Sequence, residues 1–245
     1  MRNLKLILEY DGAAYHGWQR QINGLTVQQV LEEKIAVMTG ETVKVIGSGR
    51  TDAGVHALGQ VVHFKTAATL PDIHFLKGIN SLLPADIAVK VLQETDPSFH
   101  ARYDAKSKVY LYQVVHGPVR PVMLRRYAWF VPGPLDIGRI QEAALHIMGT
   151  HDFSSFCSTH SDAPDHIRTM TDIRIETGSP GLIKIEMEAD GFLRHMVRGI
   201  VGTLIEVGRN KRAGSDLPAI LHAKDRREGG MTAPPHGLFL KEVKY

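Results

Sequence analysis

Cysteine is nearly absent from this chain of 245 residues, which contains only Cys157. One cysteine cannot form an intrachain disulfide framework, and such scarcity is typical of proteins in a reducing compartment. Long hydrophobic runs are also missing, since no stretch approaches the roughly 18 to 20 apolar residues that a membrane-spanning helix needs. The apolar residues 4–8 are too few for a signal peptide, and Glu9 and Asp11 follow them at once. We therefore expect a cytoplasmic protein with no membrane partner.

The chain also lacks a strong excess of either charge. Its formal net charge is +3, which by itself is weak support for a nucleic-acid partner. Residues 1–105 carry 10 Lys+Arg against 11 Asp+Glu, whereas residues 106–245 carry 19 against 15, so the basic excess lies in the second half. There, basic residues cluster, for example at Arg125-Arg126 and Arg209-Asn210-Lys211-Arg212. From charge alone, either a phosphate-binding face or an ordinary solvated surface would explain these clusters.

Metal-binding motifs are missing although the chain has 13 histidines. Neither His-Glu-x-x-His nor Cys-x-x-Cys occurs, and Cys157 has no second cysteine to join it as a ligand. We therefore expect no metal site. The densest group of histidines comprises His146, His151, His160 and His166.

The hydrophobic pattern of the first half alternates between the period of a strand and the period of a helix. Thr26 and Gly40 are suited to begin and end the first helix. The predicted order is β-α-β-β-α-β, the split-βαβ pattern, which packs two helices on one face of an antiparallel sheet. The strands are expected at residues 4–10, 43–46, 59–64 and 87–93, and the helices at 27–38 and 72–81.

A similar order of elements is expected in the second half. The sequence thus predicts an α+β fold of two split-βαβ (ferredoxin-like or RRM-like) domains, residues 1–105 and 106–245, with a ligand cleft between them. Each would be an antiparallel sheet with helices on one face. The predicted elements are strands at 108–115 and 237–243, helices at 136–148 and 193–207, and a hairpin of strands 173–177 and 182–189 around Gly178-Ser179-Pro180-Gly181.

The loop at residues 47–56, Gly-Ser-Gly-Arg-Thr-Asp-Ala-Gly-Val-His, is the densest group of chemically suggestive residues. Its glycines permit a tight backbone, from which Arg50, Thr51 and Asp52 present a cation, a hydroxyl and a carboxylate. The loop lacks the Lys-Ser/Thr that a phosphate-binding P-loop requires. Considered alone, it has two interpretations: a reactive loop, or a structural turn closed by the Asp52 side chain.

Several blocks of this sequence resemble the bacterial tRNA pseudouridine synthase A family. The loop Gly-Arg-Thr-Asp-Ala-Gly-Val-His-Ala at residues 49–57 is the hallmark of that family, and the resemblance extends over essentially the whole chain. Six ordered blocks are far more specific than any one of them. Beside the loop, the six blocks are residues 9–12 with 17–19, 99–103 with 105–110, 152–156, 195–198 with 200–202, 223–226, and 233–238.

The resemblance implies an enzyme that converts uridine to pseudouridine at positions 38, 39 and 40 of the tRNA anticodon stem-loop. It further implies a homodimer and a reaction without cofactor or metal. Asp52 matches the essential aspartate, as a nucleophile at C1′ or at the base, or as a general base. Arg198 matches the arginine that pairs with it, Tyr110 the tyrosine that stacks on the target uracil, and Arg50 the residue that keeps the nucleotide flipped. The roles of Arg194 and His56 stay open.

The residues also leave two other classes of function to consider. A passive RNA-binding protein would fit the split-βαβ order, but the aromatic RNP motif of RRM domains is not found. A metal-dependent nuclease would need several carboxylates in one loop, and no candidate loop has them. In the first half, residues 1–105 carry the candidate catalytic loop. The second half, residues 106–245, carries the basic excess and is expected to bind RNA. Turnover without divalent metal would separate the three classes.

Overall fold

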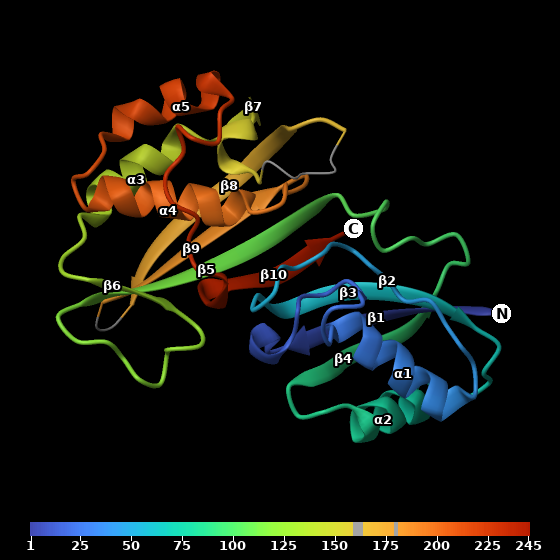
Figure 1. Ribbon diagram of the computed structural model, residues 1–245. Helices are drawn as coiled ribbons and strands as arrows, with labels where there is room; N and C mark the ends of the chain where they lie inside the picture. Colours follow the sequence, from blue (N-terminus) through green and yellow to red (C-terminus); the bar gives the residue numbers. More distant parts are fainter. Residues whose placement is uncertain (159–163, 179–180) are drawn as a thin grey trace. The chain divides into compact units, whose positions relative to one another are not determined.

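The computed structural model describes residues 1–158, 164–178 and 181–245, and it divides into two compact units (Figure 1). The first unit comprises Met1–Lys106 and Phe239–Tyr245, and the second comprises Ser107–Leu238. Each unit combines a sheet with helices, so the architecture is mixed α and β. His160 and the turn residues Ser179-Pro180 lie outside the described residues. None of the helices in the described part of the chain is long and apolar enough to span a membrane.

The last strand differs from the expected division at residue 105. The sequence assigned it to the domain 106–245, but most of β10 (Leu238–Lys244) belongs to the first unit. The reason is main-chain pairing, because β10 lies parallel to β3 (His56–Thr66), with Phe239 opposite His56 and Leu240 opposite Ala57. Pairing between strands so distant in sequence leaves no trace in local periodicity.

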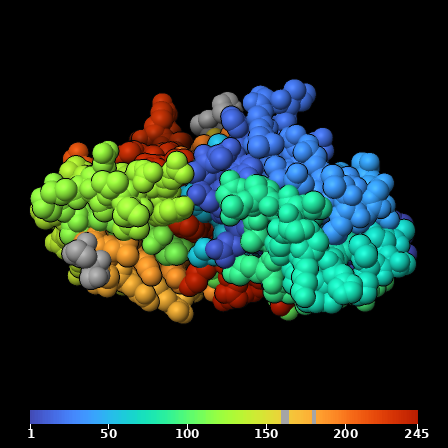
Figure 2. Space-filling view, turned by 90° about the horizontal axis from the view of Figure 1, so that it is seen from below, coloured from blue at the N-terminus to red at the C-terminus, as the bar shows by residue number. Residues whose placement is uncertain are grey.

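The first unit is built around β1 (Arg2–Tyr10), which pairs antiparallel with β3 on one side and with β4 (Ile87–Thr95) on the other. Alternate side chains of β1 are buried, as the period of two predicts. The helices α1 (Val27–Thr39) and α2 (Asp72–Leu82) lie against each other on one side of this sheet (Figure 1). Their residues form much of the surface of this unit in Figure 2.

The boundaries of α1 confirm the prediction made from its end residues. The Thr26 hydroxyl accepts a hydrogen bond from the Gln29 main-chain N–H, which would otherwise be unpaired at the start of the helix. Gly40 ends the helix in the left-handed conformation, with φ of 72°. These local interactions are short-range, and this is why the sequence alone predicts them.

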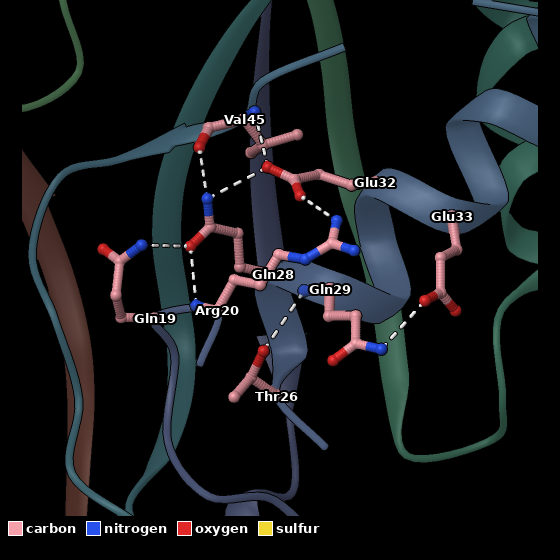
Figure 3. Close-up of polar contacts among 8 residues, drawn as sticks. All are labelled: Gln19, Arg20, Thr26, Gln28, Gln29, Glu32, Glu33 and Val45. Carbon is pink, nitrogen blue, oxygen red and sulfur yellow. Dashed lines mark hydrogen bonds and ion pairs between the residues drawn. The ribbon is translucent and has the colours of Figure 1, made fainter. Parts of the chain in front are cut away.

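The predicted strand at residues 43–46 is wrong for most of its length, because the structure has only the short strand β2 (Ile46–Gly47). The main-chain groups of Val45 are bonded by side chains of α1 instead (Figure 3). Its N–H donates to Glu32 Oε1 at 3.0 Å, and its carbonyl accepts from Gln28 Nε2 at 3.0 Å. Side-chain bonds therefore replace the sheet ladder here.

The second unit contains an antiparallel sheet in the order β5 (Ser107–Gly117), β9 (Leu182–Ala189), β8 (Ile167–Gly178), β7 (Gly149–Asp152). Its helix α4 (Met196–Gly208) is buried along almost its entire length. Two short strands, β6 (Trp129–Pro132) and β7 (Gly149–Asp152), and the helix α5 (Leu217–Ala223) were not predicted, because four to seven residues are too few for a clear period. A further helix of this unit is α3 (Ile137–Leu145).

Candidate active site

The Asp52 loop connects β2 to β3 in the first unit. Asp52 is half-buried and Arg50 is exposed. The Asp52 carbonyl accepts a hydrogen bond from the Val55 N–H at 3.1 Å, which closes a tight turn, and Gly54 in that turn has a φ of 77°. The positive φ explains why glycine stands at this position.

Thr51 holds the loop from its buried side. Its carbonyl accepts a hydrogen bond from the Trp18 N–H at 3.0 Å, and its hydroxyl lies 2.8 Å from the Tyr10 hydroxyl. Burial raises the pKa of Tyr10 above its ordinary value, so its phenol stays neutral and can donate. The residue beside Asp52 is therefore held by both its main chain and its side chain.

Two glycines allow the N-terminal segment to approach this loop closely. A Cβ on Gly12 would lie 1.9 Å from the Val55 carbonyl oxygen, and one on Gly17 would lie 2.5 Å from the Thr51 carbonyl oxygen. Gly17 also has a φ of 86°. Any side chain at these positions would therefore displace the loop. The segments at residues 9–12 and 17–19 thus pack directly against the Asp52 loop.

Buried polar side chains fix the start of the loop. The Ser48 hydroxyl donates to Gln60 Oε1 at 2.7 Å, and Gln60 Nε2 donates to the Gly49 carbonyl at 2.9 Å. Both Ser48 and Gln60 are fully buried. At the other end of the loop, the buried His56 ring stacks on Phe239, with centroids 4.7 Å apart, so His56 packs inside the first unit. Hence the backbone on either side of Asp52 is anchored to β3.

In the second unit, Tyr110 lies on β5 opposite Met187 of β9. The Tyr110 side chain is 8% exposed. Its ring packs edge to face with the Phe192 ring, with centroids 4.9 Å apart and planes at 77°. Edge-to-face packing of this kind fixes the plane of a ring. Tyr110 is therefore an oriented aromatic surface with a small exposed part.

Arg198 lies in the first turn of α4 and is half-buried. Its Nε donates to the Ala233 carbonyl at 2.7 Å, while the Ala233 N–H donates to the Arg198 carbonyl at 3.0 Å. Next to this pair, the Tyr112 hydroxyl donates to the Pro234 carbonyl at 2.7 Å. Burial raises the pKa of Tyr112, and the positive charge of Arg198 opposes that rise. The segment at residues 231–234 therefore orients the guanidinium.

The start of α4 is a second unusual feature of this region. His195, the residue before the helix, has a φ of 65°, which is uncommon outside glycine. Two turns further along, a Cβ on Gly202 would lie 1.7 Å from the Met231 carbonyl oxygen. Backbone strain and close approach thus occur together beside Arg198, and such strain persists only where the surroundings impose it.

The sequence-predicted residues divide between the units. Arg50 and Asp52 share one loop of the first unit, while Tyr110 and Arg198 belong to the second. Sequence reasoning missed the bracing role of Tyr10 and of the segment at residues 231–234. Both regions overlap motifs of the family resemblance, which were the only indication of them. Arg194 is exposed. Within the described ranges, no group of three or more His, Cys, Asp or Glu side chains is placed to hold a metal ion.

Comparisons with known proteins match this chain over most or all of its length. A family model described as tRNA pseudouridine synthase matches residues 6–104 and 143–245. Proteins named tRNA pseudouridine synthase A are similar over 245 residues, which is 100% of both chains. Those from Acetivibrio thermocellus, Thermoanaerobacter sp. and Geotalea uraniireducens are 47%, 46% and 46% identical to it.

Proposed function

We propose, because the chain belongs to the tRNA pseudouridine synthase family, that it isomerises uridine at positions 38, 39 and 40 of the tRNA anticodon stem-loop with Asp52 as its essential carboxylate. It is an isomerase acting on tRNA. The reaction breaks the bond between N1 and C1′, turns the uracil and joins C5 to C1′. C5 releases its proton, and N1 takes up a proton in exchange. Reactants and products balance without redox change or hydrolysis.

The anchoring of the Asp52 loop is the observation that carries the proposal. A carboxylate acts as nucleophile or base only if it is held within reach of one atom of the substrate. The main chain of Asp52 is closed into a turn with Val55, and the neighbouring Thr51 is bonded to Trp18 and Tyr10. The loop therefore presents Asp52 without further ordering. Its chemical role as nucleophile or general base stays open.

Three other residues receive roles in the same proposal. Tyr110 would stack on the flipped uracil, and its edge-to-face contact with Phe192 supports this role by fixing the ring. Arg198 would pair with the Asp52 carboxylate, and the hydrogen bond from its Nε to the Ala233 carbonyl supports this role by orienting the guanidinium. The exposed Arg50 would hold the flipped nucleotide by its backbone.

The proposal has further parts that come from family membership. The protein would act as a homodimer in the cytoplasm, with neither cofactor nor metal. Its two units would be split-βαβ domains, the first with the catalytic loop and the second with the RNA-binding surface. The unit-1 sheet order of β4, β1, β3 supports the split-βαβ assignment, because that pattern places its first strand between its third and fourth.

Tritium release from tRNA labelled at uridine C5, with EDTA present, tests the activity. We expect release from a tRNA with uridine at positions 38 to 40, and none when all three are replaced by cytidine. Release that persists after the replacement would contradict the assigned positions. No release from either tRNA, with binding intact, would instead indicate a passive RNA-binding protein.

A further inference from the structure

Tyr103 is an exposed aromatic side chain, with 76% of its surface accessible, and it lies outside the proposed active site. It belongs to the tight turn at residues 100–104, which follows β4 in the first unit. An exposed tyrosine usually gains little from a fixed position, since ordering a side chain costs entropy. We therefore expect that the interactions which order the Tyr103 ring serve a function.

The Tyr103 ring is held by the histidine three residues before it. It stacks on the His100 ring, with centroids 4.2 Å apart and planes at 27°. His100 Nδ1 accepts hydrogen bonds from the main-chain N–H groups of Arg102 and Tyr103, both at 3.2 Å. The turn is closed by Asp104, whose Oδ2 accepts from the His100 N–H at 2.8 Å. One face of Tyr103 is thus covered and the ring is ordered before any ligand binds.

Buried contacts fix the same turn to the sheet. The Ala101 N–H donates to His63 Nδ1 at 3.1 Å, and the Ala101 carbonyl accepts from the Tyr245 hydroxyl at 2.7 Å. Ala101 itself is fully buried. Asn3 adds a third anchor, because its Nδ2 donates to the carbonyls of Asp96 and Phe99. The turn at residues 100–104 with its stacked His100 and Tyr103 rings, here called the Tyr103 platform, is therefore rigid relative to β1 and β3.

A cation lies beside the Tyr103 ring, and another lies over two rings that neighbour one another at the same end of the sheet. The Arg102 guanidinium lies 5.8 Å from the Tyr103 ring centroid, and Lys5 Nζ lies 4.4 Å from the Tyr245 ring and 5.1 Å from the Phe99 ring. The nearby Asp104 carboxylate already accepts the hydrogen bond that closes the turn. An ordered ring beside a guanidinium group is the combination that single-stranded RNA meets in its binding proteins, since bases stack and phosphates need cations.

The platform lies well away from the Asp52 loop along β3. His63, which anchors it, is seven residues beyond His56, where the strand leaves the loop. At about 3.3 Å per residue, the separation along the strand is roughly 20 Å. A base stacked on Tyr103 is therefore a different nucleotide from the one that Asp52 would attack. Such a contact contributes to tRNA affinity and leaves the chemical step unchanged.

We propose that Tyr103, stacked on His100 and bordered by Arg102, binds an unpaired nucleobase of the tRNA remote from the isomerised uridine. This inference rests on the proposed function for the identity of the RNA. It adds a contact for tRNA affinity that lies outside the reaction chemistry.

The test measures Kd for tRNA together with kcat and KM of tritium release, using the full chain and three variants. Tyr103→Ala should raise Kd and KM roughly tenfold, because stacking on one aromatic ring contributes about that much affinity. Tyr103→Phe, which keeps the ring, should restore both values to within about twofold of wild type. Val37→Ala, which truncates an exposed apolar residue of α1, is the matched surface control and should change neither.

A second measurement guards against misfolding of the alanine variant. In Tyr103→Trp, added tRNA should quench the emission of the new indole as a base stacks on it. Unchanged Kd in Tyr103→Ala, equal losses in the alanine and phenylalanine variants, a loss confined to kcat, or an unquenched indole would each overturn the inference. Wild-type protein that binds tRNA but releases no tritium would refute the proposed function alone, and the quenching result would still decide the platform.

Discussion

The Asp52 loop of the first unit and the Arg198 turn of the second are both braced by close backbone approaches, but in different ways. Asp52 lies in an irregular loop, held by other loop segments through Gly12 and Gly17. Arg198 lies on a regular buried helix, held by the segment at residues 231–234 through Gly202 and Ala233. The Asp52 carboxylate is thus positioned by tight turns. The Arg198 guanidinium is positioned by helix α4 and by the segment at residues 231–234, here called the strap.

The two regions are therefore sensitive to different substitutions. A helix keeps its main-chain bonds when one contact is lost, so the Arg198 turn should tolerate small changes in geometry better. The Asp52 loop has no repeating main-chain hydrogen bonds that would keep its shape after the loss of one contact. Its geometry depends on single interactions, and we expect substitutions there to affect turnover more than stability.

The largest effect is expected from Gly17→Ala. The new Cβ would lie 2.5 Å from the Thr51 carbonyl and the φ of 86° would be strained, so the loop must shift. We expect turnover to fall roughly a hundredfold, which a displacement of about 1 Å can cause. Gly40→Ala is the control, because Gly40 also has a positive φ of 72° but no atom within 4 Å. It should cost about 1 kcal/mol of stability and no activity. Native turnover in Gly17→Ala would refute the bracing argument.

The next effect concerns the aromatic ring of the second unit. Tyr110→Ala should lower kcat/KM by roughly 10- to 100-fold, since base stacking on an aromatic ring contributes on that scale. Tyr110→Phe keeps the ring and its contact with Phe192, so its kcat/KM should stay within about threefold of wild type, in line with a stacking role. Equal losses in both variants would assign the effect to the hydroxyl instead.

A smaller effect, on stability, is expected in the network that Figure 3 shows. Gln28→Leu removes the donor to Glu32 Oε1 and to the Val45 carbonyl, both buried, and should cost about 2 kcal/mol in the free energy of unfolding. Gln29→Leu on the same helix breaks only an exposed bond to Glu33, and should cost less than about 0.5 kcal/mol. Urea unfolding compares them, and equal costs would contradict a structural role for the buried network.

The smallest effect concerns pH and His63. Burial, with the nearby charges of His100 and Lys65, lowers the pKa of His63 from 6.5 to about 4, although Asp104 acts in the opposite direction. The unfolded chain therefore binds this proton first. The stabilisation is complete above pH 6.5 and is lost as the pH falls toward 4, by about 1 kcal/mol near pH 6. His63→Asn, which keeps an acceptor, should flatten this slope in unfolding measured from pH 7.5 to 4.5. An unchanged slope would assign the loss to other groups.

How far the sequence predicts the fold depends on the range of the interactions involved. Helix α1 was predictable because Thr26 and Gly40 act within one turn of it. The strand expected at residues 43–46 failed because Gln28 and Glu32 take the main-chain bonds of Val45. No pattern within that segment could indicate side chains that come from a helix.

The candidate site shows the same dependence on range. Asp52 and Arg50 lie in one contiguous, glycine-rich motif, so the residues themselves pointed to that loop. The strap that orients Arg198 lies 35 residues further along the chain at Ala233 and was visible only as a motif of the resemblance. The pairing of β10 with β3 is longer in range still, and the boundary at residue 105 did not anticipate it.

The measurement that tests the central claim most directly compares Asp52→Asn with wild type, in single-turnover pseudouridine formation and in tRNA binding. Asparagine keeps the size of the side chain and removes its charge, so the braced loop should be retained. We predict no detectable pseudouridine from the variant and a Kd for tRNA within about threefold of wild type. Pseudouridine formation by Asp52→Asn at a rate near that of wild type would contradict the account.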